Sequence, residues 1–372
     1  MIYLDYQATT PVAPEVAEAM QPWIADRFVN PHSPSRWGRE AAAAIEVARK
    51  QVEQAIGLPG GGLAFTGSAT EALNWALKGT LEKAPAGRNR IVTVATEHAA
   101  VLDSCEWLES RGHDLTRLPV GPDGLLNLGD LEEALDERVA IVAVMLVNNE
   151  IGVIQPVGDI ARLAHEAGAL MLCDAVQGLG RVEIPEGPDL VAVSAHKVHG
   201  PKGIGALWMR IGAEPAPIIH GGGQELGLRS GTLSPALCVG FGAAARLASE
   251  RREQDRAHVE RLWDAALAQL GSGWTVNGSV EHRYRGNLNI HREGVDGARL
   301  ISDLRDIAFS LGSACASGSG RPSHVLRALG LTDRQARSSI RLGFGRYTTE
   351  EELIGAVRRI DAAARAQQGL AA

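Results

Sequence analysis

Clusters of basic residues are absent from this chain of 372 residues, in which 44 acidic residues outnumber 37 basic ones. The formal net charge is −7, and no block of Lys and Arg stands out, so the sequence lacks the positive surface that nucleic acids and anionic membranes require. It also lacks an apolar run long enough for a signal peptide or a membrane span. We therefore expect a cytoplasmic protein that acts on a small molecule, without a nucleic-acid partner and without membrane attachment.

Cysteine is also scarce, with four residues, Cys105, Cys173, Cys238 and Cys315. They form no CxxC pair and share no repeated spacing, which argues against a zinc site and against a disulfide framework. We expect no metal site and reduced thiols. The first three cysteines fall in apolar helix or strand patterns, where packing explains a thiol.

Lys197 is the one lysine of five that is placed for chemistry, because it follows the apolar run 190–193 within Ser194-Ala195-His196-Lys197. An amine at the end of a buried strand, beside a hydroxyl and an imidazole, suits a Schiff base with a phosphate-bearing aldehyde such as pyridoxal phosphate. A lysine at a strand end is more often a solvated charge, so this assignment depends on its neighbours.

Short apolar runs alternate with helical patterns through the N-terminal part of the chain. The runs are almost entirely apolar, which indicates strands buried on both faces, in a mostly parallel mixed sheet flanked by helices. This pattern predicts an α/β fold. The expected strands are 62–65, 91–94, 139–145, 170–173, 190–193 and 205–209, and the expected helices are 38–56, 70–81, 101–110, 128–135 and 157–167.

A change of pattern near Ser249 predicts a second domain. A long, charged helical pattern runs from about Pro235 towards Leu270, and a strand at 287–290, a helix at 297–304 and a closing helix at 350–366 follow it. We expect a large cofactor-binding domain over residues 12–250. Residues 1–11 and 251–372 would form a smaller α+β domain.

Polar residues follow several expected strands, at the edge where parallel sheets bind ligands. A glycine and short hydroxyls open the helix at Ala69 and Thr70, whose backbone N–H groups suit a phosphate, although the same pattern is a helix cap. His98 is placed to stack on a pyridine ring, although loop histidines usually face solvent. Asn149 offers an amide, although Asn-rich turns are common.

Asp174 follows the strand 170–173, where a carboxylate would keep a pyridine nitrogen protonated and so make the ring an electron sink. Capping of the next turn is the alternative. Gln177 would lie on the same side of that turn. Together with Lys197, these groups predict a pyridoxal-phosphate site.

Two residues of the C-terminal part indicate the reaction. Cys315 lies among Gly, Ala and Ser from Gly312 to Gly320, which cannot build a core, so packing does not explain its thiol. A thiol near a pyridoxal site indicates sulfur transfer. Arg341 suits the α-carboxylate of an amino acid, with a structural salt bridge as the alternative and Arg346 as a second candidate.

These ordered motifs resemble the NifS/IscS-like cysteine desulfurases, which share the fold of class V aminotransferases among the type I pyridoxal-phosphate-dependent transferases. The resemblance covers almost the whole chain. The matching motifs are Tyr3 to Pro11, Thr96-Glu97-His98, Asn148 to Gly152, Asp174 to Gln177, Ser194 to Lys197, Arg229 to Thr232, Gly312 to Cys315 and Ser339-Ile340-Arg341.

The resemblance implies a homodimer in which Lys197 forms the Schiff base with pyridoxal 5'-phosphate and His98 stacks on its ring. Asp174 would pair with the ring nitrogen, and Arg341 would bind the carboxylate of L-cysteine. The residues implied at the ring oxygen are Gln177 and Asn149, and those implied at the phosphate are Ser194, His196, the Ala69-Thr70 turn and Thr232 of the partner subunit.

The implied reaction converts L-cysteine to L-alanine. Lys197 would remove the α-proton, Cys315 would attack the substrate sulfur as a thiolate and keep it as a persulfide, and His98 would transfer protons. The sulfur would pass to an acceptor protein such as an iron–sulfur scaffold, for clusters, thiocofactors or thiolated tRNA. The alternatives are an aminotransferase that leaves Cys315 idle, a selenocysteine lyase, and a cofactor-free scaffold for cluster assembly.

The chain departs from the family pattern at three places. Ser35 stands where relatives with a long loop usually carry histidine, and Gly343 stands where serine is common. The end of the chain, Gln368 to Ala372, lacks the extension with which some members bind the scaffold protein. The identity of the sulfur acceptor therefore stays open.

Overall fold

A seven-stranded sheet forms the centre of the computed structural model, which describes residues 1–312 and 322–370. The strand order is β2-β8-β7-β6-β5-β3-β4, and only β8 runs against its neighbours, so the sheet is mixed and mostly parallel, as predicted. Its strands are β2 (Gly61–Thr66), β3 (Arg90–Val94), β4 (Asp114–Leu118), β5 (Val139–Met145), β6 (Leu170–Asp174), β7 (Leu190–Ser194) and β8 (Gly205–Arg210).

Helices cover both faces of this sheet, which explains its apolar strands. In β7, Val191 and Val193 pack with one group of helices, whereas Leu190 and Ala192 pack with the other. The first group includes α1 (Pro14–Ile24), α2 (Arg36–Ile56), α6 (Val157–Glu166) and part of α7 (Pro235–Gln269), and the second includes α3 (Ala69–Lys83) and α4 (Ala99–Glu109). The short α5 (Leu128–Ala134) lies beside α6 and β4.

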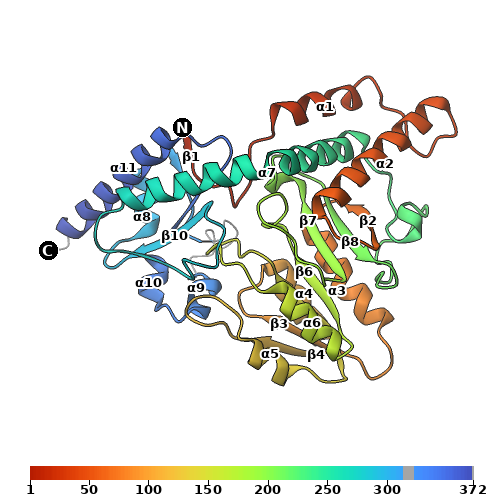
Figure 1. The fold of residues 1–372 in the computed structure, drawn as a ribbon, viewed down its shortest axis with the longest axis horizontal. Helices are drawn as coiled ribbons and strands as arrows, with labels where there is room; N and C mark the ends of the chain where they lie inside the picture. Colours follow the sequence, from red (N-terminus) through yellow and green to blue (C-terminus); the bar gives the residue numbers. More distant parts are fainter. Residues whose placement is uncertain (313–321, 371–372) are drawn as a thin grey trace.

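A smaller α+β unit is built around a second core. Its sheet has the order β12-β10-β9, and the N-terminal β1 pairs with β11. The elements are β1 (Ile2–Tyr3), β9 (Trp274–Val276), β10 (Asn287–Arg292), α8 (Gly297–Asp303), β11 (Ile307–Ala308), α9 (His324–Ala328), α10 (Asp333–Arg337), β12 (Ser339–Gly343) and α11 (Glu350–Leu370). Figure 1 shows both ends of the chain in this unit.

Helix α7 connects the two cores. Its residues 241–248 pack in the core of the large sheet, whereas Val259, Leu262 and Trp263 pack in the smaller one, and Figure 1 shows the helix running between them. Leu4 belongs to the smaller core as well. These contacts support the predicted division at residue 250, which stays a prediction. Among the described residues, no helix combines the length and apolarity needed to cross a membrane.

Strand β4 and helix α1 are among the elements that the sequence analysis missed, and both were missed for physical reasons. Strand β4 lies at the sheet edge, and Asp114 and Arg117 face solvent, so the apolar run that marks a buried strand is missing there. Helix α1 buries only Val16 and contains Pro22, so its apolar face is narrow. An element that buries little surface carries little periodic signal.

The close packing of α7 against α2 predicts that glycine-to-alanine substitutions at Gly242 and Gly355 change the thermal midpoint of unfolding in opposite directions. A Cβ at Gly242 would lie 2.6 Å from Ala48 Cα and 2.5 Å from Gln51 Oε1, whereas nothing lies within 4 Å of a Cβ at Gly355 in α11. Gly242→Ala should therefore lower the thermal midpoint, since overpacking costs about 1–3 kcal/mol. Gly355→Ala, the matched control, should raise it by the equivalent of about 0.5–1 kcal/mol. Calorimetry of both variants checks this, and equal midpoints would contradict it.

Candidate active site

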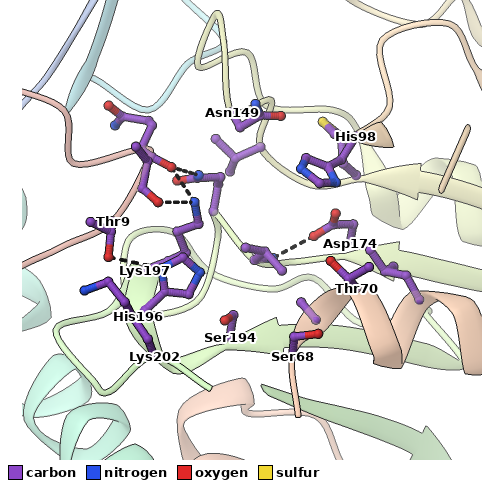
Figure 2. A pocket seen from close by; sticks show the side chains of 18 of the residues that line it. Thr9, Ser68, Thr70, His98, Asn149, Asp174, Ser194, His196, Lys197 and Lys202 are labelled. Atoms are coloured by element: carbon purple, nitrogen blue, oxygen red, sulfur yellow. Dashed lines mark hydrogen bonds between the residues drawn. The ribbon is translucent and has the colours of Figure 1, made fainter. Parts of the chain in front are cut away.

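The residues predicted from the sequence gather around one cavity of about 570 Å³ at the carboxyl ends of the central strands. Figure 2 shows the side chains of His98, Asn149, Asp174, Ser194, His196 and Lys197 around it. The predicted residues that line it are Ala69, Thr70, His98, Asn149, Asp174, Gln177, Ser194, His196, Lys197 and Arg341. Thr232 is exposed and lies outside the lining, and Cys315 falls outside the described residues. The volume suits a cofactor with a small substrate.

Lys197 ends the short 3-10 turn η1 (Ala195–Lys197), which follows β7 directly. Its Nζ donates to the carbonyl oxygens of Gln7 at 2.5 Å and Ala8 at 2.8 Å. Burial, together with the positive charges of Arg181 and Arg341, lowers the pKa of Lys197 from 10.5 to about 8. The amine therefore loses its proton, and becomes a nucleophile, at a lower pH than an ordinary lysine.

The start of α3, residues Ser68 to Thr70, forms a corner of the cavity that suits an anion, and we refer to it as the phosphate corner. Ser68 caps the helix through its Oγ, which accepts from Glu71 N at 3.2 Å, and the N–H groups of Ala69 and Thr70 lie in the first turn, where a helix has no internal acceptors for them. The helix cap is therefore observed and is compatible with a phosphate at this corner, which stays a prediction. Gly205 of β8 allows this approach, because a Cβ there would lie 2.5 Å from Ser68 C and 2.6 Å from Ala69 N.

His196 borders the cavity as a neutral ring. Burial and the charge of Lys197 lower the pKa of His196 to about 4. Its Nδ1 lies 3.1 Å from Thr9 Oγ1, and its carbonyl accepts from Thr10 N at 2.9 Å. The N-terminal segment thus holds the loop that carries Lys197.

Asp174 and His98 form the opposite wall. Asp174 is buried at the end of β6, and its Oδ1 accepts from Val176 N at 2.9 Å. Burial raises the pKa of Asp174, while His98, the Val176 N–H and Lys197 oppose the rise. His98 caps α4, with its Nδ1 accepting from Ala100 N at 3.1 Å, so the neutral ring carries its proton on Nε2. His98 is thus oriented by the helix and is not a free loop residue.

Gln177 and Asn149 line the cavity with part of their polar groups already bonded. Gln177 Nε2 donates to Gln7 O at 2.9 Å, and its Oε1 accepts from Arg181 Nη1. The carbonyl of Asn149 accepts from Arg341 Nη1 at 2.8 Å, which leaves the Asn149 side-chain amide for the cavity.

Arg341 forms a salt bridge and also borders the cavity, and its role at the substrate carboxylate stays a prediction. Its side chain is 1% exposed, and Nη2 pairs with Asp5 Oδ1 at 2.8 Å, while the buried Nε has no partner among the described residues. The guanidinium thus borders the cavity with donor capacity to spare. Arg346 does not reach the cavity, because it pairs with Asp255 Oδ2 at 2.7 Å beside α7.

Comparison with known proteins identifies the family. The family described as aminotransferase class-V matches residues 2–354. The chain belongs to that family. It is 45% identical over 370 residues to the cysteine desulfurase IscS of Rickettsia bellii (strain OSU 85-389), a match that covers 96% of this chain and 90% of the relative. The IscS of Rickettsia akari (strain Hartford) is 44% identical over the same length, with the same coverage.

Solved structures agree with this family. One named "NIFS-LIKE PROTEIN" superposes with a TM-score of 0.91 at 33% identity, covering 97% of this chain and 98% of the other. Another, titled "SspA in complex with cysteine", gives a TM-score of 0.83 at 34% identity, covering 94% and 100%. The resemblance drawn from the motifs, the predicted fold class and the dependence on pyridoxal phosphate are confirmed by these matches.

The cavity of this class V family member fits the cofactor. Lys197 offers the amine, Asp174 a buried carboxylate for the ring nitrogen, and the start of α3 a phosphate site. The bound ring supplies an electron sink for a carbanion at the substrate α-carbon. The individual residue roles implied by the resemblance stay predictions.

Several residues of the site carry no sign of their role in the local sequence pattern. Arg181 Nη2 donates to Lys197 O at 2.8 Å, and its charge acts on the amine. Glu97 is buried behind the wall, where burial and Asp174 raise its pKa well above the usual value. Asp5 and Gln7 belong to the N-terminal motif that the resemblance had marked, and only that motif pointed to them.

Two of the three departures have a structural explanation. Ser35 caps α2, with its Oγ accepting from Gly38 N at 3.1 Å. At Gly343, a Cβ would overlap Gln7 Oε1 and lie 2.8 Å from Tyr6 N. A side chain at position 343 would therefore clash with Gln7, which explains the glycine there.

The positive charge of Arg181 predicts a shift in the pH dependence of imine formation at Lys197. Its positive charge disfavours the protonated amine, so Arg181→Gln should raise the pKa of Lys197 from about 8 towards 10.5. The pH midpoint for the rate of imine formation with added pyridoxal phosphate should rise accordingly, as followed by absorbance. Arg162→Gln, a control on an exposed pair of α6, should leave it unchanged. An unshifted midpoint in Arg181→Gln would refute the electrostatic account.

The close approach at Gly205 predicts a loss of cofactor affinity. Gly205→Ala should push the start of α3 away, and overpacking of about 1–3 kcal/mol corresponds to about five- to 140-fold weaker binding. Gly62→Ala is the control, since nothing lies within 4 Å of its Cβ in the adjacent β2. Titration of the apoprotein with pyridoxal phosphate measures both, and equal affinities would contradict the assignment of the phosphate corner.

Proposed function

We propose that this enzyme is a cysteine desulfurase, which converts L-cysteine to L-alanine and transfers the sulfur to Cys315. The observation that carries the proposal is the amine of lowered pKa in one cavity with Arg341, in a chain 45% identical to a cysteine desulfurase. The reaction balances without an added oxidant, because one cysteine thiol and L-cysteine yield alanine and a persulfide on Cys315.

Three residues of the cavity have separate roles in the proposed reaction. Arg341 binds the substrate carboxylate, with its spare Nε aligned by the pairing to Asp5. Lys197, once neutral, takes the proton from the substrate α-carbon. His98 presents Nε2–H to the cavity and donates a proton as the carbon–sulfur bond breaks.

The sulfur leaves the substrate by attack of the Cys315 thiolate, which forms a sulfur–sulfur bond as the carbon–sulfur bond breaks. Uptake of a proton at the former sulfur-bearing carbon completes L-alanine. We extend the proposal to an acceptor protein, such as an iron–sulfur cluster scaffold, which would take the terminal sulfur from Cys315. Relatives that carry the name IscS support this acceptor class.

We also propose that the enzyme is a homodimer in which Thr232 reaches the partner's phosphate site. Thr232 is exposed in the single chain. Nearby, Ile211 and Leu226 are 77% and 98% exposed and line a second hollow of about 720 Å³. Exposed apolar side chains gathered at a hollow are typical of protein–protein interfaces.

Two substitutions separate desulfuration from transamination. Cys315→Ala should retain the imine absorbance and lose sulfide release from L-cysteine in the presence of a dithiol, because sulfur has no nucleophile to receive it. Lys197→Ala should lose both the imine and the alanine product. The measurements are the absorbance of the bound cofactor, alanine and sulfide.

The control is Cys238→Ser, at a buried cysteine of α7 outside the cavity, which should keep the imine absorbance and the sulfide release of the folded enzyme. Unchanged sulfide release by Cys315→Ala would exclude the persulfide step. Consumption of L-cysteine by the wild-type enzyme without alanine or sulfide as products would favour a transaminase.

A further inference from the structure

The segment from Ile219 to Ser234 leads into α7 and contains Thr232. Two charged contacts, at Glu225 and Arg229, bind it to α2, to the end of β2 and to the start of α3. The turn between β2 and α3 leads to the phosphate corner described above. We refer to residues 219–234 as the crossing segment.

The first contact is a buried ion pair. Glu225 is 3% exposed, and its carboxylate accepts from Arg49 Nη1 at 2.7 Å and Arg49 Nη2 at 2.8 Å. Its Oε2 also accepts from the backbone N–H of Phe65 at 2.7 Å, near the end of the edge strand β2. One carboxylate of the crossing segment therefore binds both α2 and the end of the strand that leads to the phosphate corner.

The backbone at this contact is strained. Glu225 and Leu226 have φ values of 50° and 58°, in the left-handed region that residues with a side chain seldom adopt. Such a conformation costs of order 1–3 kcal/mol per residue and persists where surrounding contacts hold it. The three hydrogen bonds to the Glu225 carboxylate are such contacts.

The second contact involves the phosphate corner itself. Arg229 forms a bidentate pair with Glu71, with Nε to Oε1 at 2.7 Å and Nη2 to Oε2 at 3.2 Å. The same Glu71 Oε2 accepts from Gly67 N at 2.7 Å, in the turn before α3. A Cβ at Gly67 would lie 2.9 Å from this oxygen, so the turn is closely fitted to Glu71.

The two contacts are complementary in charge. The crossing segment contributes the acid Glu225 and the base Arg229, whereas α2 contributes the base Arg49 and α3 the acid Glu71. The Glu225 carboxylate accepts from Phe65 N, and the Glu71 carboxylate accepts from Gly67 N. These two backbone donors flank Thr66. The position of the segment and the shape of the phosphate corner therefore depend on the same carboxylates.

We propose that the Arg229–Glu71 pair, supported by Arg49–Glu225, couples the phosphate corner of one subunit to the segment that delivers Thr232 to the other subunit. Glu71 and Arg229 are positioning residues that act on two cofactor sites at once. This inference rests on the homodimer proposed above. It predicts that a change at Arg229 weakens cofactor binding in the neighbouring subunit, whose own residues are intact.

Mixed dimers test this effect across the interface. One chain carries Lys197→Ala together with Arg229→Gln, and the other is wild type, so the imine forms only in the wild-type chain, which receives Thr232 from the variant chain. The reference dimer carries Lys197→Ala without Arg229→Gln. Release of pyridoxal phosphate, measured by the decay of imine absorbance, should be about tenfold faster than in the reference, since charged hydrogen bonds of this kind are each worth about a factor of ten.

Two further variants control the experiment. Arg229→Lys keeps the charge and loses the two-pronged geometry, so it should give an intermediate rate and covers the case in which Arg229→Gln fails to fold. Arg246→Gln removes an exposed pair with Glu250 on α7 and should match the reference.

The outcomes distinguish this inference from the proposed function. Equal release rates in the Arg229 variants and the reference overturn the coupling alone, provided that Thr232→Ala placed in the Lys197→Ala chain does accelerate release. If Thr232→Ala has no effect across the interface, or if the protein sediments as a monomer, the proposed dimeric site is wrong and the coupling falls with it.

Discussion

The site depends on holding one lysine amine away from water, among positive charges and backbone carbonyls. Lys197 Nζ sits against the carbonyls of Gln7 and Ala8, while Arg181 and Arg341 disfavour its charged form. An ordinary solvated lysine is almost fully protonated near neutral pH and is a poor nucleophile. Burial of this amine at the end of β7 is therefore the condition for imine chemistry, and the surrounding residues are arranged to keep it.

The N-terminal segment supplies most of that arrangement. It begins in the smaller unit, where β1 pairs with β11, and then passes along the cavity. On the way Asp5 binds Arg341 and Ser310, and Gln7 accepts from Lys197 and Gln177 through its carbonyl. A few residues thus connect Arg341 to the amine of Lys197. This connection places the cavity between two separately packed cores.

The sequence predicted the central elements well because buried elements have recognisable patterns of apolar residues. Strands β5, β6 and β7 lie close to their predicted bounds, since both faces of these strands are apolar, and α2 to α6 follow the predicted helices within a few residues. Edge and surface elements such as β4 and α1 have weaker apolar patterns. Lys197, Asp174 and His98 were found because each follows a strand at the ligand-binding edge, and the whole motif set resembled one family.

The sequence by itself determined the fold class and the family, because these follow from local patterns and ordered motifs, and it predicted Lys197 as the reactive amine. Only the tertiary structure decided that Arg181 lies against Lys197, that Asp5 pairs with Arg341, and that Glu71 binds both Gly67 and Arg229. Apart from the contact between Glu71 and Gly67, these pairings join residues from different elements of the chain, and their strength depends on separation and burial. Those two quantities exist only once the chain has folded.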